Sequence, residues 1–312
     1  MGKVLVNPFY NKDVISIRDF SKTDLEYLFR MSDEIKELSL EEKKELAHGK
    51  VLGTLFFEPS TRTRLSFETA MLSIGGETIS VTDVKTSSIN KGESLNDTIK
   101  TVESYVDLIV LRHNMEGAAR FAAEISEIPI INGGSGIEEH PSQAMLDIYT
   151  ILKERGNLNN LKIAIIGDLK YSRTVYSLLY GLAHFYPKIF LVSPSSLKIR
   201  DGSIIDLENK AKFSQHSDIE EIINEVDVIY VTRIQKERFP DPIEYEKVKG
   251  SYIIDNKLLS KGRKDVIVMH PLPRTTEINP EVDFTPNAKY FHQVKYGKIV
   301  RSALISLILN KD

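Results

Sequence analysis

Short apolar runs recur along the chain and alternate with stretches that have helical spacing. The runs are rich in Val and Ile and are bounded by Gly, Pro, Asp or Ser, as the buried strands of parallel sheets usually are. Eight runs are predicted strands: residues 51–57, 78–84, 108–111, 128–131, 163–166, 189–192, 226–231 and 266–269. This alternation predicts an α/β fold with open, mostly parallel sheets flanked by helices.

Helix starts are indicated where a serine is followed three residues later by an acidic residue, which is the capping-box pattern. The pattern occurs at Ser21, Ser94 and Ser217. A further helix is predicted over residues 141–152, because proline suits the first helical turn and apolar residues follow at helical spacing. The last helix, predicted over residues 302–309, is apolar on one face and is expected to pack against earlier structure.

Two domains are expected rather than one large sheet. A chain of 312 residues can form two cores of ordinary size. A polar turn at residues 156–160 follows the predicted helix 141–152 and precedes the strand 163–166, which favours a boundary in this region. The predicted first domain comprises residues 1–140 plus 298–312, and the second comprises residues 141–297.

Composition excludes several classes of function. The net charge of −3 gives no electrostatic reason to expect nucleic acid, so an anion site would have to be a local cluster of cations. The absence of cysteine excludes disulfides, thiolate nucleophiles and cysteine-ligated zinc in this chain, and it suits a cytosolic protein. No signal-peptide core is visible, and no window approaches the roughly 18 apolar residues of a membrane span. We therefore expect a cytoplasmic protein.

Cationic and polar residues follow six of the predicted strands, at the edge where open α/β sheets bind ligands. A single arginine after a strand is usually a solvated loop residue, but several at one edge indicate a ligand with several negative charges. The runs are Ser60-Thr61-Arg62-Thr63-Arg64, Arg112-His113, His140-Pro141-Ser142-Gln143, Lys170-Tyr171-Ser172-Arg173-Thr174, Arg233-Ile234-Gln235 and His270-Pro271-Leu272-Pro273-Arg274.

The run Ser60-Thr61-Arg62-Thr63 is the strongest candidate for a phosphate site. It follows a strand and opens a predicted helix, whose first N–H groups and positive dipole end attract phosphate. Its hydroxyls add donors, and its arginine adds a bidentate charged contact. An ordinary helix cap beside a surface arginine is the alternative. A Walker-type nucleotide site and a nicotinamide dehydrogenase are disfavoured, because neither glycine pattern occurs.

Taken in order, these runs resemble the motifs of the aspartate carbamoyltransferases over essentially the whole chain. Ser60-Thr61-Arg62-Thr63 alone would indicate only the wider carbamoyltransferase family. The run around Arg173 and the sequence His270-Pro271-Leu272-Pro273-Arg274 point to the aspartate branch. Ornithine carbamoyltransferases typically have His-Cys-Leu-Pro at the latter place, and this chain has no cysteine.

The resemblance implies transfer of the carbamoyl group of carbamoyl phosphate to the amine of L-aspartate, in pyrimidine biosynthesis, without a cofactor or a metal. The first domain would bind carbamoyl phosphate and the second would bind aspartate, with two helices linking them. A homotrimer whose active sites are shared between chains is implied as well, and a separate regulatory chain is possible.

The resemblance also implies roles for individual residues. The phosphate would be held by Ser60, Thr61, Arg62 and Thr63. The carbonyl oxygen of the carbamoyl group would be polarised by Thr63, Arg112 and His140, although without the family context His140 would more often be a capping or core histidine. The carbamoyl NH₂ would be bound by Gln143 and by the backbone carbonyls of Pro271 and Leu272.

The aspartate carboxylates would be gripped by Arg173, Arg233 and Gln235, since the guanidinium fork pairs with a carboxylate bidentately. Lys91, a catalytic residue by resemblance, and Ser87 or Ser88 would reach in from a neighbouring chain. Supporting or structural roles are expected for the remaining candidates: Arg64, His113, Lys170 and Arg274.

Three alternatives to this function stay open. An ornithine-type carbamoyltransferase would share the phosphate site but need a different acceptor site, and Arg173 and Arg233 disfavour a cationic acceptor. A binding protein for an anionic metabolite would bind the same ligands without turnover. A scaffold protein would not need these residues to converge.

Overall fold

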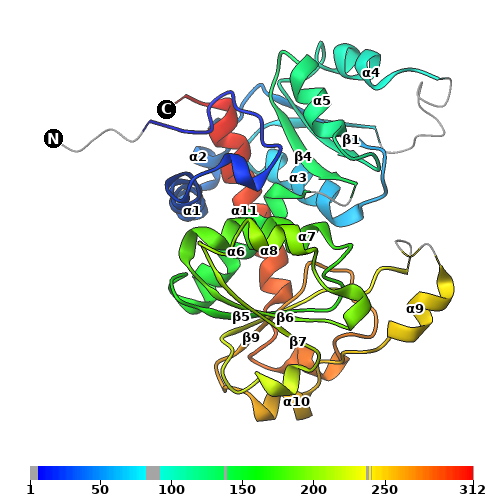
Figure 1. Cartoon of the computed structure of the whole chain (residues 1–312). Helices are drawn as coiled ribbons and strands as arrows, with labels where there is room; N and C mark the ends of the chain where they lie inside the picture. Colours follow the sequence, from blue (N-terminus) through cyan, green and yellow to red (C-terminus); the bar gives the residue numbers. More distant parts are fainter. Residues whose placement is uncertain (1–5, 82–91, 137–138, 237–238, 240, 312) are drawn as a thin grey trace. The chain divides into compact units, whose positions relative to one another are not determined.

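The computed structural model describes residues 6–81, 92–136, 139–236, 239 and 241–311. The chain divides into two compact units, Met1–Leu146 with Tyr296–Asp312 and Asp147–Lys295. Both divisions fall inside helices, α6 (Pro141–Arg155) and α11 (Tyr290–Leu309), which Figure 1 labels. They lie close to the predicted divisions at 140/141 and 297/298.

The first unit contains a parallel four-stranded sheet with the strand order β2-β1-β3-β4. Its strands are β1 Val51–Phe56, β2 Glu77–Val81, β3 Leu108–His113 and β4 Ile130–Ser135. Its other helices are α1 Lys22–Glu37, α2 Leu40–Glu45, α3 Thr61–Ser73, α4 Leu95–Val102 and α5 Ala118–Ile125 (Figure 1). Because the strands share one direction, their carboxyl ends form one edge, where Phe56 pairs with Arg112.

Different helices cover the two faces of this sheet, because successive side chains of a strand point to opposite faces. On one face, Ile109 belongs to a core cluster with Ala119 and Ala122 of α5. On the other face, Thr54 Oγ1 donates a hydrogen bond to Glu68 Oε1 of α3 at 3.2 Å. Helix α3 therefore starts at the carboxyl edge of the sheet and runs back along its face.

The C-terminal half of α11 packs against α3. The hydroxyl of Ser302 lies 3.2 Å from the hydroxyl of Ser73 and donates to the carbonyl of Ala70 at 3.3 Å. This confirms that the apolar segment 302–309 packs against earlier structure. The helix is longer than predicted, because it begins at Tyr290.

The second unit contains a parallel five-stranded sheet with the order β7-β6-β5-β8-β9. Its strands are β5 Lys162–Ile166, β6 Lys188–Val192, β7 Lys212–His216, β8 Val228–Val231 and β9 Ile267–Met269, and its other helices are α7 Arg173–Leu182, α8 Asp201–Ile205, α9 Pro242–Val248 and α10 Asn256–Lys261. On one face, Ala164 and Val268 join a core cluster with Ile222 and Leu258. The two parallel sheets confirm the predicted fold class.

Two local predictions need correction. Strand β7 has no counterpart among the predicted strands, because Lys-Phe-Ser-Gln-His contains no apolar run and this edge strand is at most partly buried. The predicted helix start at Ser217 is wrong: Asp218 is the cap, its side chain accepts from the Glu220 N–H at 2.9 Å, and only a single 3-10 turn follows. The predicted caps at Ser21 and Ser94 are confirmed.

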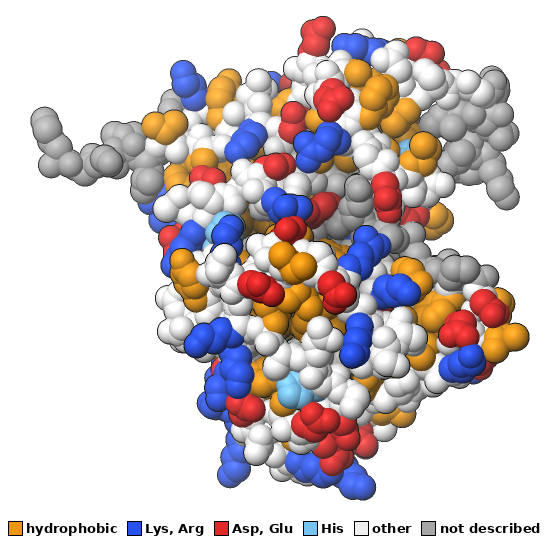
Figure 2. Space-filling view, in the orientation of Figure 1, with side chains coloured by type: hydrophobic (Ala, Val, Ile, Leu, Met, Phe, Trp, Pro, Cys, Tyr) orange, Lys and Arg blue, Asp and Glu red, His pale blue; other side chains and the backbone are white. Residues whose placement is uncertain are grey.

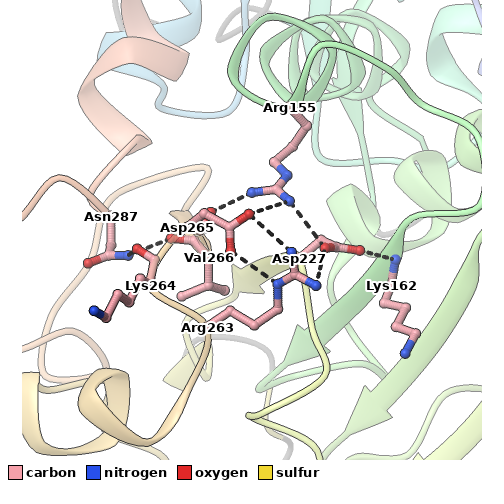
Figure 3. A network of polar contacts seen from close by, with 8 residues as sticks. All are labelled: Arg155, Lys162, Asp227, Arg263, Lys264, Asp265, Val266 and Asn287. Atoms are coloured by element: carbon pink, nitrogen blue, oxygen red, sulfur yellow. Dashed lines mark hydrogen bonds and ion pairs between the residues drawn. The ribbon is translucent and has the colours of Figure 1, made fainter.

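A network of ion pairs lies at the amino ends of the strands of the second sheet, at the edge opposite to their carboxyl ends (Figure 3). Arg155, the last residue of α6, donates to Asp227 at 3.2 Å and to the Asp265 carboxylate at 3.0 Å. Asp227 also accepts from the Lys162 backbone N–H at 2.9 Å, and Arg263 donates to Asp265 at 3.1 Å. These contacts attach α6 to the start of β5 and to the segments that precede β8 and β9.

The surface carries charges of both signs. Figure 2 shows Lys and Arg side chains interspersed with Asp and Glu over the face in view, in keeping with the small net charge. Within the part of the chain that the structure describes, no helix is both long and apolar enough to cross a membrane.

Candidate functional site

The start of α3 presents hydrogen-bond donors at the carboxyl edge of the first sheet. Ser60 is the N-cap residue, with an extended backbone (φ −158°, ψ 94°), and within the described chain its side chain makes no capping hydrogen bond. The N–H groups of a first helical turn have no partner inside the helix, which makes a helix start without a serine cap suited to an anion. Thr61 and Arg62 are exposed and Thr63 is buried. This geometry favours an anion site over a serine-capped helix.

Arg112 is buried at the end of β3, next to this helix start, with only 7% of its surface exposed. Its Nη1 donates to the Gly133 carbonyl at 3.0 Å, and its Nη2 donates to Glu58 Oε1 at 3.2 Å. A buried guanidinium needs such partners, because an uncompensated buried charge is strongly destabilising. The contacts orient the fork from two sides, so little side-chain entropy remains to be lost when an anion binds.

His140 and Thr63 meet at the same edge. Thr63 Oγ1 and His140 Nε2 lie 3.5 Å apart, and His140 is 4% exposed. The backbone carbonyl of His140 accepts from the Gln143 and Ala144 N–H groups at the start of α6. The histidine therefore caps α6 through its backbone while its ring contacts Thr63. Gln143, one turn into α6, is 9% exposed.

The second unit has its own cationic loops at the carboxyl edge of its sheet. Arg173 is the first residue of α7 and is 9% exposed. The preceding loop is ordered by Asp168, whose buried carboxylate accepts from the Lys170 and Tyr171 N–H groups at 3.2 and 2.9 Å. Burial raises the pKa of Asp168, while these hydrogen bonds and one from the Gln235 backbone act to lower it. Asp168 thereby joins the loop after β5 to the segment after β8.

A close approach between the same two loops requires glycine at position 167. Gly167 has φ +115°, in the region that favours glycine, and a Cβ there would lie 2.2 Å from the Thr232 carbonyl oxygen. The Thr232 hydroxyl donates back to the Ile166 carbonyl at 3.0 Å. Arg233 directly follows Thr232 and is partly buried, so this contact fixes the backbone from which Arg233 extends.

The turn after β9 is fixed by hydrogen bonds to His270. The Leu272 N–H donates to His270 Nδ1 at 2.8 Å, which places the ring proton on Nε2, 2.8 Å from Glu277 Oε1. Leu272 has φ +58°, a left-handed conformation that costs a leucine about 1 kcal/mol. The other Glu277 oxygen accepts from the N–H and hydroxyl of Thr275 and from the Thr276 N–H.

Charges around this turn shift two pKa values. Burial lowers the pKa of His270, and Glu277 acts to raise it while Arg274 and Arg233 act to lower it further. Burial by itself would raise the pKa of Glu277, but the hydrogen bond from His270, with smaller contributions from Thr275, lowers it to about 2. The turn therefore holds an ionised carboxylate, and its Pro271 and Leu272 carbonyls are mounted on a backbone with several fixed points.

The structure places the candidates in two groups. The first group lies at or beside the carboxyl edge of the first sheet and comprises Ser60, Thr61, Arg62, Thr63, Arg112, His140 and Gln143. The second group lies at the carboxyl edge of the second sheet and comprises Arg173, Arg233, Gln235, Pro271 and Leu272. Lys91, Ser87 and Ser88 lie outside the described residues. No cluster of metal-ligating side chains is found in the part of the chain that the structure describes.

Two of the candidates expected to have supporting or structural roles form ion pairs. Arg274 forms an ion pair with Asp283, with Nη2 and Oδ2 2.5 Å apart, and Arg64 pairs with Glu68 at 3.2 Å. Glu58, which orients Arg112, was not among the candidates. Its position directly before Pro59 and the serine-threonine run was the only available signal.

Family models match most of the chain. Residues 12–153 match the carbamoyl-P binding domain of the aspartate/ornithine carbamoyltransferases, and residues 159–308 match their Asp/Orn binding domain. The chain belongs to the aspartate/ornithine carbamoyltransferase family. The two matches correspond to the two sheets, so in this family's terms each unit carries one ligand-binding domain.

Similar proteins lie within the aspartate branch of the family. The aspartate carbamoyltransferase catalytic subunit of Nitrosopumilus maritimus is 54% identical over 307 residues, covering 98% of this chain and 99% of that protein. The catalytic subunit of M. jannaschii aspartate transcarbamoylase is 50% identical, with a TM-score of 0.87 and coverage of 95% and 97%. The Trypanosoma cruzi enzyme in complex with carbamoyl phosphate and aspartate is 36% identical, with a TM-score of 0.93 and coverage of 98% and 99%.

Proposed function

We propose that this chain transfers the carbamoyl group of carbamoyl phosphate to the amine of L-aspartate, yielding N-carbamoyl-L-aspartate and phosphate, in cytoplasmic pyrimidine biosynthesis. The observation that carries the choice of acceptor is the pair of arginines in the second unit. Arg173 is nearly buried at a helix start, and Arg233 is partly buried close enough to His270 to affect its pKa. Two guanidinium groups suit a dicarboxylate and repel the side-chain ammonium of ornithine.

The first unit binds the phosphate. Ser60, Thr61 and Thr63 supply hydroxyls and helix N–H groups, and Arg62 supplies a charged donor from the exposed face of the first turn. The exposure of Arg62 is what a ligand anchor needs, because its guanidinium is reachable from solvent. This assignment is supported by the uncapped helix start.

Catalysis follows from stabilising charge on the carbamoyl oxygen. Attack by the amine converts that carbonyl oxygen into an oxyanion, and donors fixed beforehand stabilise it without reorganisation. Thr63, Arg112 and His140 are such donors, since each is at least nine-tenths buried and two of them are in contact. Removing one oxyanion donor typically costs about 100-fold to 1,000-fold in kcat.

The remaining groups bind the carbamoyl nitrogen and the acceptor. Gln143 and the carbonyls of Pro271 and Leu272 accept hydrogen bonds from the carbamoyl NH₂, while Arg173, Arg233 and Gln235 bind the aspartate carboxylates. The rigidity of the turn after β9 supports this role, because backbone carbonyls lose little entropy when they accept a hydrogen bond.

The assembly proposed is a homotrimer in which Lys91 and Ser87 complete the site of a neighbouring chain. This part of the proposal rests on the resemblance of the segment 86–93 to the corresponding loop of the family. A separate regulatory chain is compatible with it, and any zinc ligands of cysteine type would then belong to that partner, since this chain has no cysteine.

An acceptor panel tests the proposed function. Purified protein is incubated with carbamoyl phosphate and either aspartate, ornithine or no acceptor, and both phosphate and the carbamoylated amino acid are quantified. We expect equal amounts of phosphate and carbamoyl aspartate, and no enzymatic product with ornithine. Faster carbamoylation of ornithine would contradict the acceptor assignment, and saturable binding without turnover would indicate an anion-binding protein.

A further inference from the structure

A buried hydrogen-bond network in the second unit connects the turn after β9, proposed to bind the carbamoyl NH₂, with the start of α7, proposed to bind aspartate. Asp147 of α6 is fully buried and lies at its centre. Tyr230 of β8 donates to Asp147 Oδ2 at 2.7 Å, and Gln293 of α11 donates to Asp147 Oδ1 at 2.5 Å. No function assigned so far uses this carboxylate.

One arm of the network ends at the turn after β9. The side-chain oxygen of Gln293 accepts from the His270 backbone N–H at 3.0 Å. Because Asp147 requires the NH₂ end of the Gln293 amide, it also determines that the oxygen faces His270. His270 in turn fixes the Leu272 N–H. The orientation of Gln293 therefore sets where the turn begins, one residue before the Pro271 carbonyl.

The other arm ends at the start of α7. The Tyr230 hydroxyl is also hydrogen-bonded to the side chain of Thr174, which directly follows Arg173. Burial raises the pKa of Tyr230 well above its usual value, and Asp147 adds to this effect, so the hydroxyl keeps its proton and remains a donor. Asp147 is thus connected by side chains to both the turn after β9 and the first turn of α7.

We propose that Asp147 is a positioning residue for the two ligand-binding loops of the second unit, holding the Pro271 and Leu272 carbonyls through Gln293 and the Arg173 helix start through Tyr230. The inference rests on the proposed function and deepens it. Burying a carboxylate has a large desolvation cost unless its hydrogen bonds are well made, and a fully buried one on a helix that crosses between units is costly if it only fills space. Fixing two ligand-binding loops at once is a use that matches its contacts.

Replacing Asp147 by asparagine disturbs the network in a defined way. If the new amide keeps its oxygen toward Tyr230, its NH₂ meets the NH₂ of Gln293. Flipping the Gln293 amide removes this pairing of two donors, but it then places the Gln293 NH₂ against the His270 backbone N–H, which is also a donor. Turning the new amide instead reverses the hydrogen bond from Tyr230, so that the Thr174 arm must rearrange. Every arrangement of Asp147→Asn therefore disturbs one arm.

A double substitution restores the pattern. Gln293→Glu alone places two carboxylates against each other, but combined with Asp147→Asn it reverses the donor and acceptor of the central hydrogen bond. The new amide then accepts from Tyr230 and donates to the new carboxylate, whose other oxygen accepts from His270. Since the partners in both arms are again satisfied, the double variant should recover most of the activity that either single variant loses.

The experiment measures kcat and KM for aspartate, and the dissociation constant of carbamoyl phosphate, in the wild type and in these three variants. Displacing ligand-binding groups by about 1 Å can cost about 100-fold, so each single variant should lose kcat/KM for aspartate by up to that factor. Carbamoyl phosphate binding should weaken much less, because its phosphate is bound by the proposed residues of the first unit and only the hydrogen bonds of its NH₂ to Pro271 and Leu272 depend on the network. Recovery in the double variant would support the proposal.

The control is Asp227→Asn, which removes a hydrogen-bonded carboxylate from the opposite edge of the same sheet (Figure 3). It should lower stability while leaving kcat/KM for aspartate normal. If Asp147→Asn does not fold, Tyr230→Phe, which deletes one hydroxyl, should give a smaller loss of the same kind.

Three results would overturn the inference alone, and the first two are an active wild type whose single variants keep normal kinetics and a double variant no better than the poorer single one. A loss of aspartate kinetics in Asp227→Asn as large as in Asp147→Asn would overturn it too, because the effect would then follow stability. A wild type that makes no carbamoyl aspartate would overturn the proposed function itself.

Discussion

Glu277 should make the stability of the protein depend on pH in a range below neutrality. Glu277 is 8% exposed, and its carboxylate accepts hydrogen bonds from His270, Thr275 and Thr276. Its pKa falls from an ordinary 4.5 to about 2. A carboxyl group whose pKa is lower in the folded state contributes stability that is fully present above the unfolded value and is lost as the pH falls toward the folded value. For Glu277 the range runs from pH 4.5 down to about 2.

The size of the effect follows from this difference. At about 1.4 kcal/mol per pH unit, the interval between the two pKa values of Glu277 corresponds to about 3 kcal/mol at neutral pH. By pH of about 3.5 the contribution should have dropped to about 2 kcal/mol. Glu277→Gln resembles the protonated acid, so its free energy of unfolding should be about 3 kcal/mol lower than that of the wild type at neutral pH. This difference between the two proteins should become smaller at acidic pH.

Urea unfolding of the two proteins at several pH values, at one protein concentration, measures this gap. Taking the difference between variant and wild type cancels the contributions of all other carboxylates. Glu208→Gln, at an exposed position in the same unit, is the control and should change the free energy of unfolding little at any pH. A gap that stays constant between neutral pH and pH of about 3.5 would refute the reasoning, since the lowered pKa requires it to narrow.

Three further predictions concern the site. Arg62→Ala should weaken carbamoyl phosphate binding about 10-fold to 100-fold in calorimetric titration, since it removes a charged hydrogen bond worth about 1.5–3 kcal/mol. The control Arg120→Ala, at another exposed arginine, should leave this binding unchanged. In steady-state kinetics, Arg233→Ala should raise KM for aspartate far more than the dissociation constant of carbamoyl phosphate; equal effects on both would contradict its role. Mixing inactive Arg62→Ala and Lys91→Ala chains should restore about one site in four in a cyclic trimer, and hybrids on a native gel without regained activity would rule out shared sites.

The sequence could predict the sheets because of where their strands lie. Strands buried on both faces must be apolar throughout, and β5 and β8 show this as continuous apolar runs. The edge strand β7 has a neighbour on one side only and is partly exposed, so nothing in its composition distinguishes it from a loop. Helix caps could be predicted where the capping residue and its partner are only three positions apart, as at Ser21 and Ser94. The predicted cap at Ser217 was wrong because the neighbouring Asp218 is also a good capping residue and takes its place.

The candidate site divides in the same way. The placement of candidates such as Arg112 and Arg173 at the carboxyl edges of the sheets could be predicted, because they lie at a strand end or open a helix. The residues that orient them could not, because their partners are distant in sequence: 54 positions separate Arg112 from Glu58, and 146 separate Gln293 from Asp147. Asp147 is an acidic residue within an otherwise apolar helical pattern, and the sequence alone does not show whether its side chain is exposed or buried.

The most direct test of the central claim is an NMR competition experiment. Carbamoyl phosphate labelled with ¹³C at the carbamoyl carbon is added to the protein with aspartate and ornithine at equal concentration. A sample without protein measures the spontaneous carbamoylation of both amines. The account predicts that the protein adds label to carbamoyl aspartate alone, at the rate at which phosphate appears. Label entering the ornithine product above the background, or no gain over the sample without protein, would contradict it.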